Sequence, residues 1–354
     1  MPLKLWLTIP CLLLFSKLVL AADHGVVLLY HHIDTDTPDI TSISPADFKA
    51  HLQLIGELGY QVKPLSQLLT ELDSGDTTDK AVAITFDDAY ISVYQTAFPL
   101  LRERGWPFTV FVNAQSVDQL QTLQMSWDQL RDLSDHGVEI GNHSLTHAHL
   151  VRYLENETHS QWLTRMENEI VGNERRLNRE LPHRSQGEQR LFAYPFGEYN
   201  PALLTLLKQK GYYSIAQQSG AVASPTQDVI PRFPLAGNWA EPARLKTALQ
   251  SRPLPVLQIN AGDMITTPDS AASALTLTLE SGFNLTSIAC YSATGTPLAA
   301  RKSGKDQLEV TLPRWTSGRQ KVNCTAPVDD EPGAHYWYSQ LWIIEEKDAT
   351  NVSS

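Results

Sequence analysis

Short apolar runs alternate with amphipathic stretches over the first 250 residues. This alternation predicts strands at 26–30, 81–86, 108–112, 138–141, 191–194 and 212–216, and helices at 45–58, 91–104, 127–136, 161–179 and 201–210. Strands that alternate with helices indicate a parallel sheet with crossover helices. Roughly seven βα repeats in about 225 residues favour a (β/α) barrel of irregular form.

A different pattern begins after the proline-marked break at 251–256. The segments 274–279, 308–312 and 321–325 alternate polar and apolar residues, and turn residues recur between them. Such a pattern is typical of an all-β sandwich. The predicted division of the chain is a signal peptide (1–22), an α/β domain (23–252), a small β-sandwich domain (255–347) and a disordered tail (348–354).

The N-terminus has the pattern of a secretory signal peptide. Lys4 supplies a positive start, residues 5–16 form an apolar run, and the small residues Ala21 and Ala22 offer a cleavage site. The apolar run is too short to span a bilayer, which favours cleavage over anchoring. We therefore expect an exported protein, periplasmic or extracellular, with no transmembrane segment after cleavage.

Cleavage changes both the cysteine count and the charge. Of the three cysteines, Cys11 would leave, and Cys290 and Cys324 would remain on predicted strands of the second domain. A single pair in an exported protein favours a disulfide over two buried thiols. The net charge of −11 becomes about −13 when Lys4 and Lys17 are removed. No basic cluster remains that could follow phosphates, so we expect a glycan rather than nucleic acid as partner.

Two motifs supply candidate chemistry at predicted strand ends. TFDDAY lies at the end of one predicted strand. HSLTH lies at the end of a second predicted strand and begins 53 residues after TFDDAY. Asp88, His143 and His147 can give one carboxylate and two imidazoles to a divalent metal, and three protein ligands with an open position characterise catalytic sites. If the HSLTH segment is helical, its two histidines share one face. On an extended segment Asp87 would point away from Asp88 and act as general base. Together these residues predict hydrolysis assisted by a metal.

The order of three motifs carries a family resemblance. TFDDAY at 85–90, H-S-x-x-H-A-x-L at 143–150 and AYPFGEY at 193–199 resemble the polysaccharide deacetylases of the NodB-homology group, carbohydrate esterase family 4. The resemblance covers roughly residues 24–250. It implies a distorted (β/α) barrel, whose chemistry sits at the C-terminal ends of the strands. It also implies that the backbone of Phe196 stabilises the oxyanion, with Tyr194 as a neighbouring oxyanion or substrate residue.

The general acid is expected near the N-terminus. Many members of the family carry this histidine after the AYPFG-like motif, but no histidine lies between His183 and His335 here. The Tyr-His at 30–31 instead resembles the poly-N-acetylglucosamine deacetylase subgroup, which implies His31 as the acid that protonates the leaving amine. His32 is the fallback, and a structural histidine is the alternative.

One position departs from the family pattern. Ala193 stands where an arginine often orients the catalytic aspartate. Arg232 is a candidate substitute, although a structural surface arginine is the favoured interpretation. His149 occupies a variable position of the second motif and is expected to be a bystander.

Several aromatic residues could stack against sugars. For Trp127, Tyr199 and Trp239 core packing is the favoured interpretation, and for the string 335–338 it is a sandwich-core strand.

The expected activity is metal-dependent removal of N-acetyl groups from N-acetylglucosamine units of a polysaccharide. The expected cofactor is one divalent ion, Zn²⁺ before others. Two alternatives stay open: an O-acetyl carbohydrate esterase with the same site, and a non-catalytic glycan-binding or export protein on the same fold.

Overall fold

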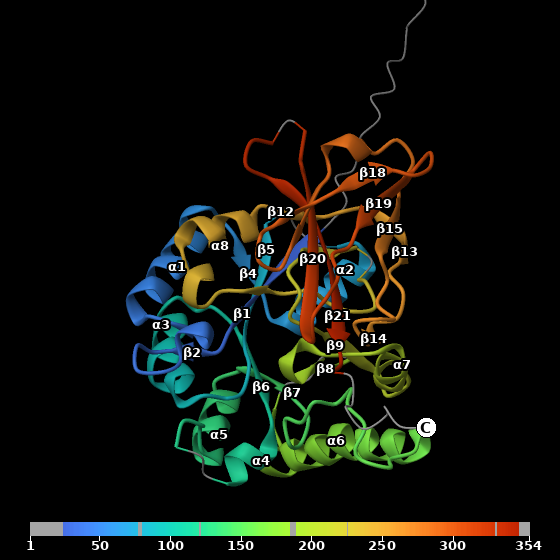
Figure 1. The fold of residues 1–354 in the computed structure, drawn as a ribbon. Helices are drawn as coiled ribbons and strands as arrows, with labels where there is room; N and C mark the ends of the chain where they lie inside the picture. Colours follow the sequence, from blue (N-terminus) through green and yellow to red (C-terminus); the bar gives the residue numbers. More distant parts are fainter. Residues whose placement is uncertain are drawn as a thin grey trace, which may run out of the picture.

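The computed structural model describes residues 24–76, 80–119, 122–184, 189–224, 226–329 and 331–346. An α/β part occupies the N-terminal two thirds of these residues, and an all-β part follows it (Figure 1). The predicted signal peptide with Cys11, and the predicted tail, lie outside the described residues. In the part of the chain that the structure describes, no helix is long and apolar enough to cross a membrane.

A curled nine-stranded sheet forms the centre of the α/β part. Its main path runs β10-β1-β5-β6-β7-β8-β9, with β11 beside β1 and β4 beside β5. All neighbours are parallel except β10 and β1. The strands are β1 (His24–Tyr30), β4 (Gln61–Val62), β5 (Ala81–Phe86), β6 (Thr109–Val112), β7 (Glu139–Asn142), β8 (Arg190–Ala193), β9 (Tyr212–Ile215), β10 (Val222–Ala223) and β11 (Phe233–Pro234).

Residues 230–234 link the two edges of this sheet. Ile230 forms a bridge with Ile215 of β9, and β11 pairs with β1 on the opposite edge. The sheet thereby closes through a short irregular segment instead of a full strand. The prediction of a distorted (β/α) barrel is confirmed by this arrangement.

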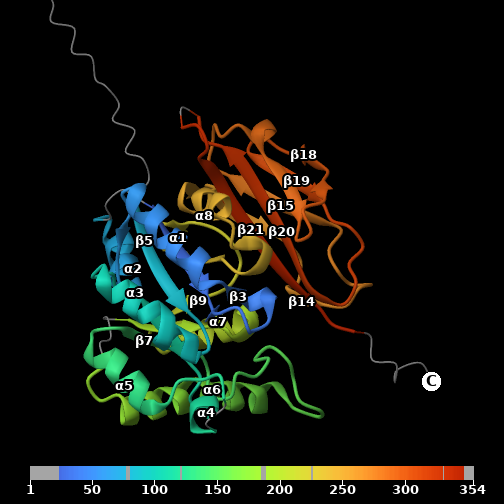
Figure 2. The same cartoon turned by 90° about the vertical axis from the view of Figure 1, so that its left-hand side faces the viewer.

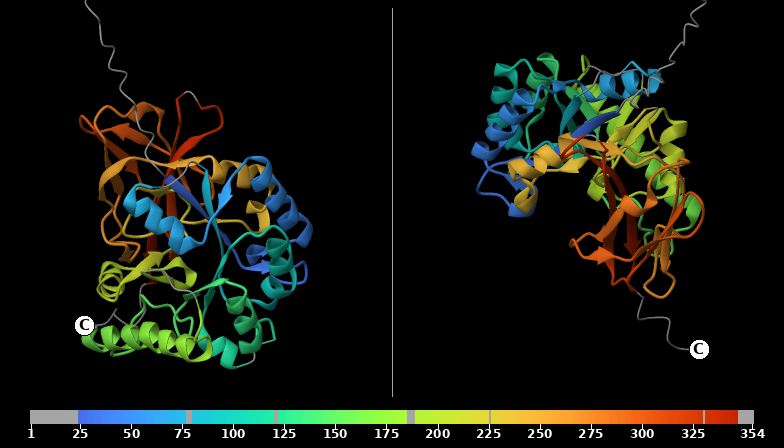
Figure 3. Two further views of the ribbon diagram at one scale, coloured as in Figure 1. Left: turned by 180° about the vertical axis from the view of Figure 1, so that it is seen from behind. Right: turned by 90° about the horizontal axis from the view of Figure 1, so that it is seen from above.

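Helices surround the sheet (Figures 2 and 3). The predicted helices form, and their ends follow local chemistry: Ser44 accepts a hydrogen bond from the N–H of Asp47 and caps α1, with Pro45 in the first turn. Three helices of the described residues, α2, α4 and α8, were not predicted. The helices are α1 (Pro45–Glu57), α2 (Leu65–Ser74), α3 (Phe98–Glu103, preceded by a π-helical turn, η2, Val93–Ala97), α4 (Ala114–Asp118), α5 (Trp127–Asp135), α6 (His159–Glu180), α7 (Pro201–Gln209) and α8 (Pro242–Leu249).

The alternation of side chains along each strand divides the core. On β8, Phe192 packs with residues of α6 and α7, whereas Leu191 and Ala193 join a cluster that includes α2. Strands buried on both faces read as continuous apolar runs, which explains why the strand signals were clear.

The all-β part contains two sheets that share one apolar cluster. One has the order β12-β21-β20-β16-β17, with β14 also paired to β21, and the other β13-β15-β19-β18. Leu277 of β15 and Trp342 of β21, one from each sheet, belong to this cluster. That the two sheets form a β-sandwich remains a prediction from the sequence. The strands are β12 (Ser251–Pro253), β13 (Val256–Asn260), β14 (Ile265–Thr266), β15 (Ala274–Leu279), β16 (Ala289–Ser292), β17 (Pro297–Leu298), β18 (Ala300–Lys302), β19 (Gln307–Thr311), β20 (Gly318–Pro327) and β21 (His335–Ile344).

Cys290 and Cys324 lie directly opposite each other on β16 and β20 and form a disulfide. The long hairpin of β20 and β21 lies along the α/β part (Figures 1 and 2). Trp337 of β21 packs edge-on against Phe233 of β11, with 5.3 Å between ring centroids. The predicted boundary near residue 252 falls within β12, which pairs with β21.

Candidate metal centre and active site

The candidate residues gather at the carboxyl ends of the strands. Asp87 and Asp88 follow β5, His143 follows β7, and Phe196 follows β8. His31 follows β1 and lies close enough to both aspartates for their charges to interact. Because parallel strands end at one edge, four short loops meet there.

Asp88, His143 and His147 form a compact cluster suited to a metal ion. One ligand atom from each lies within 4.8 Å of the others. Oδ1 of Asp88 is 3.5 Å from Nε2 of His143 and 3.2 Å from Nε2 of His147.

The surroundings of His143 test whether this cluster fits a cation. Its Nδ1 lies 2.7 Å from the carbonyl oxygen of Ala193 and donates to it, which leaves the Nε2 lone pair facing Asp88. Nε2 is buried and has no hydrogen-bond partner. Burial lowers the pKa of His143 to about 3, so the ring is neutral at physiological pH. A neutral imidazole that is oriented by the Ala193 carbonyl and keeps an unpaired buried nitrogen fits a metal ligand.

The HSLTH segment is a loop, so the helical geometry considered from the sequence is wrong. Ser144 and His147 adopt left-handed backbone conformations, with φ of 61° and 57°. The carboxylate of Glu169 on α6 holds the turn between them by accepting from the N–H groups of Leu145 and Thr146 and from the Thr146 hydroxyl. The loop still brings the two histidine rings to 4.9 Å between centroids.

Asp88 is not on an extended segment. Its φ is 69° and that of Ala89 is 52°, so the chain turns sharply after β5. Burial, opposed by nearby His31 and reinforced by Asp87, raises the pKa of Asp88 to about 6. The strained backbone at this turn directs the Asp88 carboxylate towards the histidines. The extended segment that was expected for the two aspartates is therefore wrong.

Asp87 forms a buried ion pair with Arg232. The guanidinium donates to both carboxylate oxygens, at 2.7 and 2.8 Å, and both side chains are 0% exposed. The interpretation of Arg232 as a surface arginine is therefore wrong, because the closing segment 230–234 carries it into the barrel. Burial would raise the pKa of Asp87, but Arg232 and the neighbouring histidines outweigh burial and hold that pKa well below its usual range. Gln217 donates a further, longer bond of 3.3 Å.

The two N-terminal histidines have different surroundings. His32 is buried, its ring stacks on Tyr90 with 3.6 Å between centroids, and burial lowers its pKa to about 4. His31 is only half-buried. The packing of His32 favours a structural role for it, so His31 stays our predicted proton donor and His32 the fallback.

Phe196 occupies a tight turn, η3 (Pro195–Gly197), with a left-handed φ of 58°. Its ring lies edge-on to His147 and stacks on His149 at 4.0 Å. His149 in turn donates to Glu198 at 2.8 Å, a contact that supports the turn and leaves its role as a bystander in the chemistry a prediction. Tyr194 is fully buried and stacks on Tyr199, so its ring cannot contact substrate and instead packs beneath the turn.

The other aromatic predictions divide. Tyr199 is partly buried in the cluster of α6 and α7, and Trp127 packs against the main core, in agreement with the packing interpretation. Residues 335–338 begin strand β21. The same interpretation is wrong for Trp239, which is 50% exposed in η4 (Gly237–Trp239), with Arg244 stacked over its ring.

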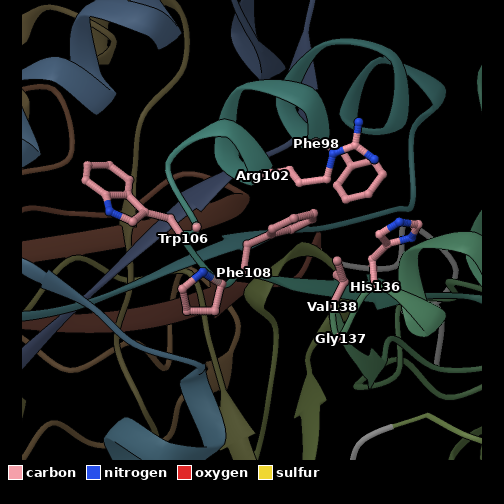
Figure 4. A pocket seen from close by; sticks show the side chains of 9 residues that line it. Phe98, Arg102, Trp106, Phe108, His136, Gly137 and Val138 are labelled. Atoms are coloured by element: carbon pink, nitrogen blue, oxygen red, sulfur yellow. The ribbon is translucent and has the colours of Figure 1, made fainter.

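One pocket lies at the opposite edge of the sheet (Figure 4). Phe108 and Val138, which line it, precede β6 and β7, so it opens at the amino ends of these strands. It contains none of the candidate site residues.

The fold and the cluster define a class: a distorted (β/α) barrel whose strand ends carry a buried Asp–Arg pair beside a two-histidine, one-carboxylate centre. Residues 74–215 match the family model described as polysaccharide deacetylase. The resemblance found in the motifs is confirmed, because residues 74–215 of this chain are similar to that family.

Two relatives show how far the likeness extends. The Bacillus subtilis protein YxkH is 26% identical over 202 residues, which cover 56% of this chain and 64% of that protein. The poly-β-1,6-N-acetyl-D-glucosamine N-deacetylase of Escherichia coli K12 is 23% identical over 250 residues, covering 60% of this chain and 37% of the relative. The chain therefore spans less than two thirds of the length of these relatives.

Solved structures share the fold. The deacetylase PplD of Streptococcus pyogenes, in complex with acetate, has a TM-score of 0.56 at 20% identity and covers 64% of this chain and 99% of its own. IcaB from Ammonifex degensii has a TM-score of 0.55 at 23% identity, covering 63% and 97%.

Proposed function

We propose that this protein is a metal-dependent polysaccharide deacetylase that removes N-acetyl groups from N-acetylglucosamine units. One observation carries the proposal: the unpaired, buried Nε2 of His143 faces Asp88 and His147 beside an ionised, oriented Asp87. The relative in Escherichia coli is named for the same reaction on poly-β-1,6-N-acetylglucosamine, which supports the substrate class.

Asp88, His143 and His147 would hold the metal, with Zn²⁺ the ion we expect from a ligand set rich in nitrogen. When bound, such an ion supplies Lewis-acid polarisation and lowers the pKa of water. The protein's own groups then account for the proton movements and the orientation.

Asp87 acts as the general base in this proposal. Arg232 keeps the carboxylate ionised and fixes its plane, so that one orientation is available for accepting a proton from the attacking water. The family often uses an arginine at the position of Ala193, and Arg232 would serve the same purpose from another strand end.

His31 donates the proton to the departing amine, and the N–H of Phe196 donates to the oxyanion. A donor preorganised in a water-poor site is worth about 3 kcal/mol in the transition state. Hydrolysis would release acetate and a free glucosamine unit. Export through the predicted signal peptide would place the enzyme where such polymers occur.

The test is acetate release by the purified protein. Poly-N-acetylglucosamine, chitin oligomers and peptidoglycan are offered in parallel, with and without chelator, and His143→Ala is the matched variant. We expect turnover on at least one amide substrate, lost with chelator and restored by added Zn²⁺.

The alternatives predict other outcomes. Release from O-acetylated glycans but from no amide substrate would assign the site to an ester. One bound metal per chain with no turnover on any glycan would favour a binding protein. Full metal content and full activity in His143→Ala would contradict the site itself.

A further inference from the structure

A strand of the all-β part reaches the catalytic turn. Arg319 lies near the start of β20, and its Nη1 donates to the carbonyl oxygen of Phe196 at 2.7 Å. Its Nε is 3.9 Å from the carboxylate of Glu198, and its guanidinium carbon is 5.9 Å from the centre of the Phe196 ring. The two residues in the hydrogen bond are 123 positions apart in the sequence.

The turn that receives this contact needs external support. Phe196 has a left-handed φ of 58°, a conformation that disfavours a side chain with a Cβ atom. A residue in such a conformation persists when its surroundings fix it. His149 covers one face of the ring, and buried Glu198 lies between His149 and Arg319, accepting from the first and paired with the second.

A second contact from the same strand reaches the neighbouring segment. Lys321, two residues after Arg319 and therefore on the same face of β20, donates to the carbonyl oxygen of Gln217 at 3.3 Å. The side chain of Gln217 donates to Asp87. Gln217 also packs so close to Gly197 that a Cβ atom on residue 197 would lie 2.7 Å from the Cβ of Gln217. Both segments that β20 contacts therefore border the catalytic groups.

We infer that the all-β part completes the active site, with Arg319 as a positioning residue that holds the Phe196 turn in its left-handed conformation. This inference rests on the proposed function for its consequence in catalysis. Arg319 does not contact the metal ligands in the described residues, so its effect is on the orientation of the Phe196 backbone. Fixing the Phe196 carbonyl restrains the ψ angle of that residue and, with the stacked ring, the direction of its N–H.

The consequence is a separation of kinetic effects. Loss of an interaction that matters mainly in the transition state lowers kcat, whereas ground-state binding and the metal are untouched. Misplacement of a catalytic group by about 1 Å can cost on the order of 100-fold. We therefore expect Arg319→Ala to lower kcat by about 10- to 100-fold, with KM and Zn²⁺ affinity changed by less than about twofold.

The experiment compares Arg319→Ala and Arg319→Lys in the full chain with the matched control Arg301→Ala. Arg301 lies on β18, pairs with Glu309 and is 75% exposed. The control should retain wild-type kcat. The lysine variant should recover only part of the loss. Its ammonium can donate to the carbonyl of Phe196, but it lacks the planar guanidinium that faces Phe196 and Glu198 together.

Hydrogen exchange of the peptide that contains residues 194–199 supplies a readout independent of activity. Exchange should be faster in Arg319→Ala and unchanged in Arg301→Ala. If Arg319→Ala folds poorly, Glu198→Gln removes the charge between Arg319 and His149 and should give the same local exchange.

The outcomes separate this inference from the proposed function. Wild-type kcat together with unchanged exchange at 194–199 in Arg319→Ala would overturn the inference. If the wild-type protein deacetylated no glycan, the proposed function would fail, and the exchange comparison alone would decide whether Arg319 holds the turn.

Discussion

At the scale of single residues, we expect Asp87 and Arg232 to depend on each other for the stability of the fold. Both are fully buried, so removing one partner strands a charge away from water. Arg232→Met should therefore lower the free energy of unfolding by about 3–5 kcal/mol. Adding Asp87→Asn to that variant should recover part of the loss, because the stranded charge is then gone. Urea unfolding of the two variants measures this coupling, and strictly additive losses would contradict it.

The two adjacent aspartates should separate by phenotype. Asp87→Asn removes the proposed base while the ligands stay in place, so turnover should fall by about 10²–10⁴-fold with metal content unchanged. Asp88→Asn should weaken metal binding instead, because it removes the one carboxylate of the cluster. Acetate release and competition with a chromogenic chelator measure the two properties. Exchanged phenotypes would reverse the assigned roles and leave the site in place.

His31 should matter most when the leaving group is basic. An amine must be protonated to depart, whereas an aryl oxide leaves without help. His31→Ala should therefore lower turnover on an N-acetylated glycan far more than on an aryl acetate, with metal retained. Parallel kcat measurements on the two substrates test this difference. Equal losses would indicate a structural or binding role, and no loss on either would redirect the search to His32.

Short motifs let the sequence predict the ligand set, but not the groups that orient it. The predicted ligands and the predicted base lie in two short motifs, TFDDAY and HSLTH, and the spacing of the residues within each motif indicates a metal site. Arg232 lies 145 residues from Asp87, and only the closing segment of the barrel brings it there. An arginine inside the apolar string VIPRFPL was the available signal, since a charged side chain flanked by apolar residues favours burial with a partner.

At the scale of elements, α6 holds the loop that carries His147. Glu169 accepts three hydrogen bonds from Leu145 and Thr146, next to two left-handed residues. Glu169→Gln replaces half of the acceptor with a donor and should loosen this loop. Supporting groups of this kind affect metal affinity by about 10–100-fold, and we expect a loss in that range.

The same helix provides the control for Glu169. Glu167 is 54% exposed and pairs with Lys210, so Glu167→Gln should leave metal affinity unchanged. Isothermal titration with Zn²⁺ compares the two variants at matched stability. Equal affinities for both would remove Glu169 from the set of positioning residues.

Elements were predictable where periodicity alone determines them. The strands β5 and β15 form over the predicted residues, because one is buried on both faces and the other alternates. The helix α2 was not predicted, although the spacing of Leu65, Leu68, Leu69 and Leu72, all of which it buries, is a sufficient signal for it. The spacing of His143 and His147 is compatible with a helix as well as with a loop. The loop is stabilised by contacts from α6, which the local sequence does not reveal.

At the scale of the whole molecule, β20 links the all-β part to the catalytic edge. The strand carries Arg319 and Lys321 at one end and Cys324 further along, where it is bonded to Cys290. A sequence pattern predicts where each strand lies in the chain, but it does not predict which strand faces the barrel. That depends on contacts between the two parts, such as the packing of Trp337 against Phe233.

The disulfide should stabilise the all-β part without being needed for catalysis. It joins cysteines 34 residues apart, and closing a loop of this size restricts the unfolded chain by about 2–4 kcal/mol. Replacing both cysteines by serine should lower the free energy of unfolding of this part by that amount. Because ten pairs of the β20–β21 ladder remain, Arg319 should stay in register and turnover at low temperature should be unchanged.

Urea unfolding followed by tryptophan fluorescence, with acetate release measured on the same samples, tests both halves of this prediction. The wild-type protein treated with reductant serves as the matched control, since it should unfold with the double-serine variant. A large loss of kcat in the folded variant would mean that the disulfide, and not the β20–β21 ladder, sets the position of Arg319 at the catalytic turn.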